Sequence, residues 1–126
     1  MDRYKNQGNN TTPTINFDLD AGTLEIKGRS IPENSVEFYK PLNEALKFYG
    51  KAPKPITTVT IELEYFNTSS AKCLLDFCKE LEALRLNGSA VTIRWGYQAE
   101  DENILEAGIE YQTMLKIPIE LYLLEE

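Results

Sequence analysis

Apolar and polar residues alternate in several segments of the chain, which is the period-two pattern of half-buried β-strands. The pattern covers residues 14–19, 23–27, 58–65 and 91–95. The clearest segment is 58–65, whose apolar face ends in Tyr65. We expect that face, Tyr65 included, to lie in the core. A last strand is predicted over residues 117–123, where Pro118 suits a strand beginning or a sheet edge.

Apolar residues at helical spacing predict three helices between these strands. They cover about residues 36–50, 71–87 and 100–115. The stripe of the first helix consists of Val36, Tyr39, Leu42, Leu46 and Tyr49. Pro41 interrupts this stripe, and an interior proline clashes with the carbonyl four residues before it. We therefore expect a kink or a late helix start, with Asn34 or Ser35 as the N-cap.

The predicted order is β-β-α-β-α-β-α-β, which is an α/β fold with a mixed, mostly parallel sheet of five strands. Strands of a fully covered parallel sheet are apolar on both faces. The second face here is polar, because it carries Glu62, Glu64, Thr92, Arg94 and Glu120. We therefore predict a two-layer sandwich with helices on one face. Neither GxGxxG nor a P-loop occurs, so the sequence does not favour a nucleotide-binding fold.

The chain has 126 residues, of which 42% are hydrophobic and 26% charged, as expected for one globular domain. Residues 1–12 are rich in Asn, Gln and Gly and are predicted to be a flexible tail before a single domain over 13–126. Residues 1–10 lack the apolar region of a signal peptide, and no segment matches a membrane span. We expect a cytoplasmic protein.

Charge and residue content narrow the function further. The chain carries 20 acidic against 13 basic residues, a formal net charge of −7, which disfavours nucleic-acid and anionic-membrane partners. It contains no histidine, the commonest general base and metal ligand. Cys73 and Cys78 do not have metal-binding or redox-motif spacing. Any catalysis would rest on Asp, Glu, Lys, Tyr or Cys alone, and we expect no catalytic residue, no metal and no cofactor.

Polar junctions follow three of the predicted strands. In a parallel α/β sheet these junctions meet at the carboxyl edge, where ligands and modifications usually lie. They are residues 33–35, 67–70 and 96–102. Helix capping explains one polar residue at 67–70 but does not need four. A phosphate on Thr68, Ser69 or Ser70 would meet free backbone N–H groups and the positive end of the helix dipole; the residues alone leave the acceptor open among the three.

Four segments resemble the SiaC family of bacterial regulatory phosphoproteins. They are Thr12-Pro13-Thr14-Ile15, Ile31-Pro32-Glu33-Asn34-Ser35, Phe66-Asn67-Thr68-Ser69-Ser70-Ala71-Lys72 and Ile93-Arg94-Trp95-Gly96-Tyr97. The resemblance spans the chain from Thr12 to the last strand. It implies a fold similar to that of STAS domains, the anti-sigma-factor antagonists, which carry a phosphorylatable hydroxyl at the same strand-to-helix turn.

The resemblance also implies a partner-switching function without catalysis. A cognate protein kinase would phosphorylate Thr68, and a PP2C-type phosphatase would remove the phosphate. The unphosphorylated form would bind an effector, a diguanylate cyclase in the member that names the family, and so raise cyclic-di-GMP and promote biofilm formation. Two departures leave the effector open. STAS domains usually have glycine soon after the acceptor, whereas Ala71 and Lys72 follow Ser69 and Ser70 here, and Gly96 stands where the member that names the family has histidine.

Neighbouring residues receive expected roles in the same scheme. Asn67 would shape the turn, Ser69 and Ser70 would offer hydroxyl and N–H groups, and Lys72 would pair with the phosphate. Candidate partner contacts are Glu33, Asn34 and Ser35 on the adjacent junction and Tyr97 at the rim, while Trp95 is expected in the core.

Three alternatives remain beside the leading one. The chain could be an anti-sigma-factor-antagonist-type adaptor for another effector. It could be an enzyme that uses carboxylates such as Glu33 and Glu102. It could also be a structural oligomerisation module that uses the open sheet face with Glu62, Glu64 and Arg94.

Overall fold

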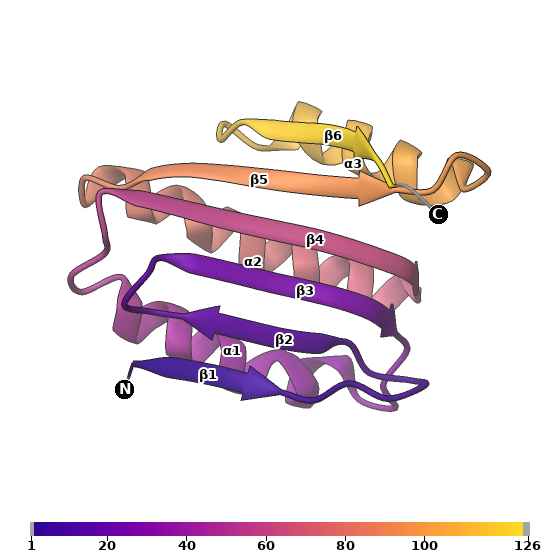
Figure 1. The fold of residues 1–126 in the computed structure, drawn as a ribbon, viewed down its shortest axis with the longest axis horizontal. Helices are drawn as coiled ribbons and strands as arrows, with labels where there is room; N and C mark the ends of the chain where they lie inside the picture. The colour runs from indigo at the N-terminus through magenta and orange to yellow at the C-terminus, as the bar shows by residue number, and fades with distance from the viewer. Residues whose placement is uncertain (1, 125–126) are drawn as a thin grey trace.

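The computed structural model describes residues 2–124, which form one mixed sheet and three helices (Figure 1). The strands are β1 (Arg3–Asn6), β2 (Thr14–Asp18), β3 (Thr23–Ser30), β4 (Ile56–Phe66), β5 (Ala90–Tyr97) and β6 (Ile119–Leu123). The helices are α1 (Ser35–Tyr49), α2 (Thr68–Leu86) and α3 (Glu102–Met114). No helix within residues 2–124 is both long enough and apolar enough to cross a membrane.

The strands lie in the sheet in the same order as in the sequence, β1-β2-β3-β4-β5-β6. The pairs β1–β2 and β2–β3 are antiparallel, and the three remaining pairs are parallel. One helix joins the two strands of each parallel pair, and all three helices cover the same face (Figure 1). Successive right-handed crossovers that advance in one direction place their helices on one side of a sheet. The predicted mixed sheet with helices on one face is therefore confirmed.

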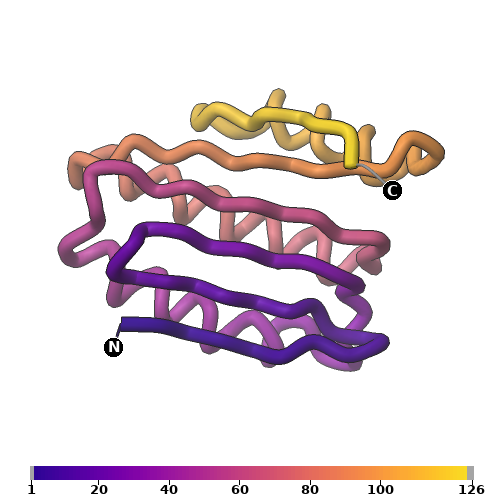
Figure 2. The backbone as a smooth tube through the Cα atoms, in the orientation of Figure 1, coloured from indigo at the N-terminus to yellow at the C-terminus, as the bar shows by residue number. Residues whose placement is uncertain are grey.

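The sheet has six strands, so the prediction of five is wrong. Residues 3–6 were assigned to a flexible tail, but they form the edge strand β1 beside β2. Arg3 forms an ion pair with Asp18 at 2.8 Å, and Tyr4 packs against the core. An edge strand pairs on one side and tolerates charged residues. Strand β1 is mostly polar, so the pattern of alternating apolar and polar residues did not predict it. Figure 2 shows that the backbone of β1 runs along one edge of the sheet.

The core lies between the sheet and the helices, as the strand pattern predicts. Trp95 is 1% exposed and donates its indole N–H to the carbonyl oxygen of Ile104 at 2.9 Å. Glu64, Arg94 and Glu120 are exposed on the other face of the sheet. No helix within the described residues covers that face (Figure 1).

Tyr65 does not lie in the core, contrary to its expected place on the inward face of β4. Its side chain is 51% exposed. The register between β3 and β4 shifts at Gly28, because Gly28 pairs with Leu63 but Arg29 pairs with Tyr65. Such a bulge reverses the alternation of side chains beyond it. Phe66 therefore turns inward, with its ring centroid 6.3 Å from that of Trp95.

The first helix also differs from its prediction. It runs without a break from Ser35 to Tyr49 and contains Pro41, which is exposed. Asn34 is the N-cap, and its side chain accepts the N–H of Glu37 at 3.2 Å. The buried stripe begins at Ser35 rather than at Val36, whose side chain is 70% exposed. Ser35 lies four residues before the buried Tyr39, which is the spacing that shares a helix face.

Candidate functional site

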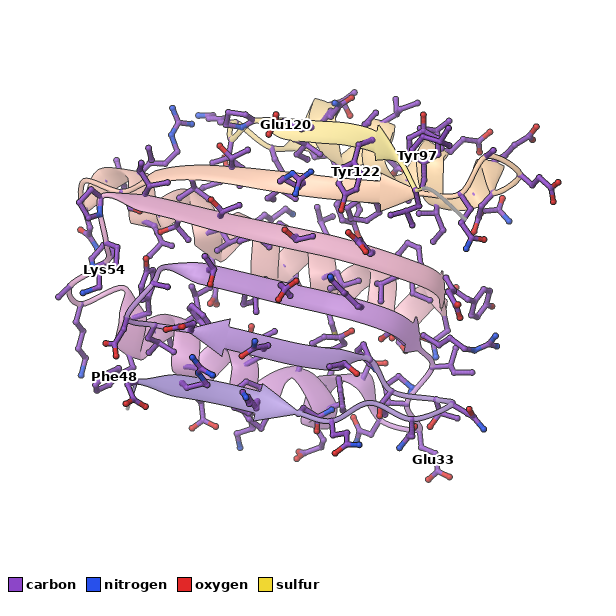
Figure 3. The ribbon with its side chains drawn as sticks, viewed as in Figure 1. Glu33, Phe48, Lys54, Tyr97, Glu120 and Tyr122 are labelled. Atoms are coloured by element: carbon purple, nitrogen blue, oxygen red, sulfur yellow. The ribbon has the colours of Figure 1, made fainter. Side chains whose placement is uncertain are left out.

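The carboxyl ends of β3, β4 and β5 meet the beginnings of α1, α2 and α3 at one edge of the sheet (Figure 1). The Asn-Thr-Ser-Ser segment occupies the middle of these three junctions, between β4 and α2. The polar junctions of the sequence predict the candidate chemistry at this edge. Figure 3 shows Glu33 near one end of the edge and Tyr97 toward the other.

Asn67 begins helix α2 by capping it. Its side-chain oxygen accepts the backbone N–H of Ser70 at 2.9 Å, and its carbonyl oxygen accepts the N–H of Ala71 at 2.9 Å. Its own N–H donates to the carbonyl of Ser30 at 3.1 Å, which ties the cap to the end of β3. Thr68 is therefore the first residue of α2, on a turn that is anchored from both sides.

The three candidate hydroxyls of this turn differ in accessibility. Thr68 and Ser69 are exposed, whereas Ser70 is 0% exposed. A modifying protein reaches exposed groups, so burial removes Ser70 from the candidates. The Thr68 hydroxyl has no hydrogen-bond partner among residues 2–124.

Behind this turn lies a chain of hydroxyl groups that crosses three elements. Ser30 donates to Ser70 at 2.8 Å, and Tyr39 lies 2.6 Å from Ser30. Ser35 lies 3.2 Å from Ser70 and 2.8 Å from Ser69, which donates to the Asn67 side-chain oxygen at 3.2 Å.

Each hydroxyl has a single proton to donate, which fixes the direction of this chain. Since Ser30 donates to Ser70 and Ser69 donates to Asn67, the order of donors is Tyr39, Ser30, Ser70, Ser35 and Ser69, with the Asn67 oxygen as the final acceptor. We call this series the hydroxyl chain. Burial raises the pKa of Tyr39 from its ordinary value of 10.0 to about 12.

Ser35 was predicted as a contact for a partner protein at the surface, but its side chain is buried. It is 4% exposed and lies inside the hydroxyl chain, next to the turn that carries Thr68. Neither Ser30 nor Tyr39 was among the predicted site residues. Ser30 is a polar residue on the apolar face of its strand, at the strand end. This interruption was the signal in the sequence that could have pointed to Ser30 as a site residue.

A shallow hollow of about 480 Å³ opens beside Thr68. Its lining includes Tyr65, Phe66, Thr68, Ala71, Asp101 and Ile104. Asp101 is also the N-cap of α3, where its carboxylate accepts the N–H of Ile104 at 3.0 Å. Tyr65 was not among the predicted site residues, because the bulge turns it outward, whereas Asp101 belongs to the junction 96–102 that was predicted at this edge.

The electrostatics of the turn suit an anion. The first turns of α1 and α3 contain Glu37 and Glu102, but the first turn of α2 contains no acidic residue. A negative group near a helix N-terminus is stabilised by the helix dipole and by unpaired N–H groups. Lys72 is exposed four residues after Thr68, so the two lie on the same face of the helix.

The remaining candidate contacts do not all lie at one place on this edge. Glu33 and Asn34 are exposed at the beginning of α1. Tyr97 is half-buried at the end of β5, where its carbonyl accepts the N–H of Leu124 at 2.8 Å. Glu33 and Tyr97 lie well apart along the edge (Figure 3).

Comparison with known proteins places this arrangement in a family. The model of the SiaC family regulatory phosphoproteins matches residues 6–124. An uncharacterised protein of Pseudomonas aeruginosa (strain UCBPP-PA14) is 32% identical over 112 residues, which are 88% of this chain and 88% of that protein.

Solved structures agree with the sequence match. SiaC of Pseudomonas aeruginosa has a TM-score of 0.89 and 27% identity, over 98% of this chain and 100% of that one. A chain of the crystal structure of the diguanylate cyclase SiaD in complex with its activator SiaC, from the same organism, has a TM-score of 0.88 and 28% identity, over 96% of this chain and 99% of that one. The chain belongs to the SiaC family of regulatory phosphoproteins.

Proposed function

We propose that this protein is a switchable activator of a diguanylate cyclase, which acts in the cytoplasm by binding and not by catalysis. Phosphorylation of Thr68 by a cognate kinase releases the cyclase, and a PP2C-type phosphatase restores binding. The similarity to SiaC in complex with the diguanylate cyclase SiaD supports the choice of partner.

One observation carries the proposal. Thr68 is exposed at the beginning of α2, beside a hollow lined by aromatic, apolar and acidic side chains, in a chain of a phosphoprotein family. The same residue can thus receive a phosphate and border a surface for a partner. Ser70 does not fit this role, because it is buried.

The gating follows from charge. A phosphate adds about −1.5 to −2 charges at pH 7. It would stand at the hollow, whose lining already contains Glu64 and Asp101. An apolar group of the cyclase would have to displace the water around this phosphate in order to dock, and removing a charge from water is costly even where Lys72 and the helix N-terminus compensate it. The unphosphorylated form is therefore the activator.

The test measures cyclic-di-GMP formation by the diguanylate cyclase of the same organism in the presence of the purified protein. Thr68→Ala should activate like the unmodified protein, while enzymatically phosphorylated protein and Thr68→Glu should activate at least about tenfold less. Thr113→Glu is the matched control. It adds the same charge at an exposed threonine, but near the C-terminal end of α3, whereas the switch turn lies beside the beginning of that helix.

Two results would contradict the proposal. Equal activation by phosphorylated and unphosphorylated protein would exclude Thr68 as the gate. If no form alters the cyclase while Thr68→Ala recovers a different effector from native cells, the partner is wrong and the adaptor alternative replaces it.

A further inference from the structure

We propose that Ser35 determines which hydroxyl of the switch segment is phosphorylated. Ser35 holds the Ser69 hydroxyl toward the interior, so that the kinase is offered Thr68. This inference rests on the proposed function, in which Thr68 is the acceptor.

Ser69 is exposed as a residue, yet its hydroxyl is engaged on both sides. It accepts from Ser35 at 2.8 Å and donates to the Asn67 side-chain oxygen at 3.2 Å. Ser35 is 4% exposed, so the bond to it directs the Ser69 hydroxyl toward the core side of the turn. Phosphorylation of Ser69 requires the side chain to rotate outward and to break both hydrogen bonds.

Ser35 is itself held in place, which makes it an effective lock. Its hydroxyl receives the proton of Ser70, which lies 3.2 Å away, and Ser70 accepts from Ser30 at 2.8 Å. Ser30 and Ser70 are both 0% exposed. Hydrogen bonds in such a series polarise one another and strengthen. Ser35 also belongs to α1, so the lock is anchored outside the helix that carries the acceptor.

Thr68 has no such constraint among residues 2–124. In the transfer, the Thr68 oxygen forms a bond to the γ-phosphorus of a nucleoside triphosphate held by the kinase. The bond between that phosphorus and the β–γ bridging oxygen breaks, the nucleoside diphosphate leaves, and the hydroxyl proton passes to a base of the kinase. No protein hydrogen bond breaks at Thr68. The same step at Ser69 loses two bonds, and each lowers the available population about fivefold.

The experiment maps phosphate by mass spectrometry on protein expressed in its native cells. The variants are Thr68→Ala alone, Thr68→Ala with Ser35→Ala, and Thr68→Ala with Ser89→Ala. Ser89 is the matched control, because it is also a buried serine, 3% exposed, with its hydroxyl 2.6 Å from that of Thr57 at the opposite edge of the sheet. We expect Ser69 phosphate to rise about fivefold or more with Ser35→Ala and to stay unchanged with Ser89→Ala.

The outcomes separate this inference from the proposed function. Phosphate on Thr68 of the unaltered protein tests the function, and its absence removes both. If Thr68 is modified, but Ser69 phosphate is the same with and without Ser35, the inference alone fails. A second measurement checks the lock directly: three-bond proton couplings should show one Ser69 rotamer in the unphosphorylated protein and averaging in Ser35→Ala. A single rotamer in both would also overturn the inference.

Discussion

The phenolic hydroxyl of Tyr111 donates to the carbonyl oxygen of Ala71 at 2.6 Å and so ties α3 to the first turn of α2. The Tyr111 ring also lies against Trp95, with 5.2 Å between centroids. We expect Tyr111→Phe to keep the ring packing and to lose about 1 kcal/mol of unfolding free energy, the net value of one hydrogen bond. Amide exchange at Ser70 and Ala71, whose N–H groups are hydrogen-bonded, should become faster.

Urea unfolding and hydrogen exchange measure these two effects. Tyr4→Phe is the control, because Tyr4 is half-buried in edge strand β1, away from α2. Equal exchange rates in Tyr111→Phe and the unaltered protein would show that this contact does not restrain the switch turn.

Tyr65 provides a test of the docking surface. We expect Tyr65→Ala to weaken binding to the cyclase about tenfold or more, because exposed aromatic residues contribute strongly at interfaces. Stability should change by less than about 0.5 kcal/mol, since the side chain is 51% exposed. Leu86→Ala is the control on binding, because Leu86 is 88% exposed at the far end of α2. Calorimetric titration of both variants would decide, and equal affinities would remove Tyr65 from the interface.

Alkaline pH should destabilise the fold. Burial raises the pKa of the Cys78 thiol from 9.0 to about 12 and that of the Tyr39 phenol from 10.0 to about 12. Between the ordinary and the raised values, the unfolded chain releases a proton that the folded chain keeps. The unfolding free energy therefore falls as pH rises from about 9 to about 12, by about 1.4 kcal/mol per pH unit for each group in its own window.

Denaturant titrations at about pH 8 and about pH 11 measure this loss. In Cys78→Val the thiol contribution should disappear and that of Tyr39 should remain, so the slope should be shallower and begin nearer pH 10. An unfolding free energy that stays constant over this interval would contradict the assigned burial.

The repeating parts of the fold could be predicted from the sequence. Period-two and helical patterns located five of the six strands and all three helices, because each of these elements buries one regular face. The polar second face of β4 and β5 also predicted correctly that helices cover only one side. Strand β1 was missed because it is an edge strand of mostly polar residues.

The site was predictable in place but not in detail. Asn67, Thr68 and Ser69 lie on the predicted turn, since a strand end and a helix beginning are both visible in the sequence. The hydroxyl chain was not visible, because Ser30 and Tyr39 reach Ser70 from other elements. Tyr65 was placed on the wrong face, because the register shift beside Gly28 reverses the pattern of β4, and a glycine within the neighbouring strand was the available sign of it.

The sequential order of the strands has a consequence for biosynthesis. Every strand pairs with the one made just before it, so no strand must wait for a later segment to insert between it and its neighbour. The sheet can then form strand by strand in the direction of translation. Helix α3 and strand β6 are the last elements to pack against it. The turn with Thr68 lies between β4 and α2, so it is complete before the ribosome has finished the chain.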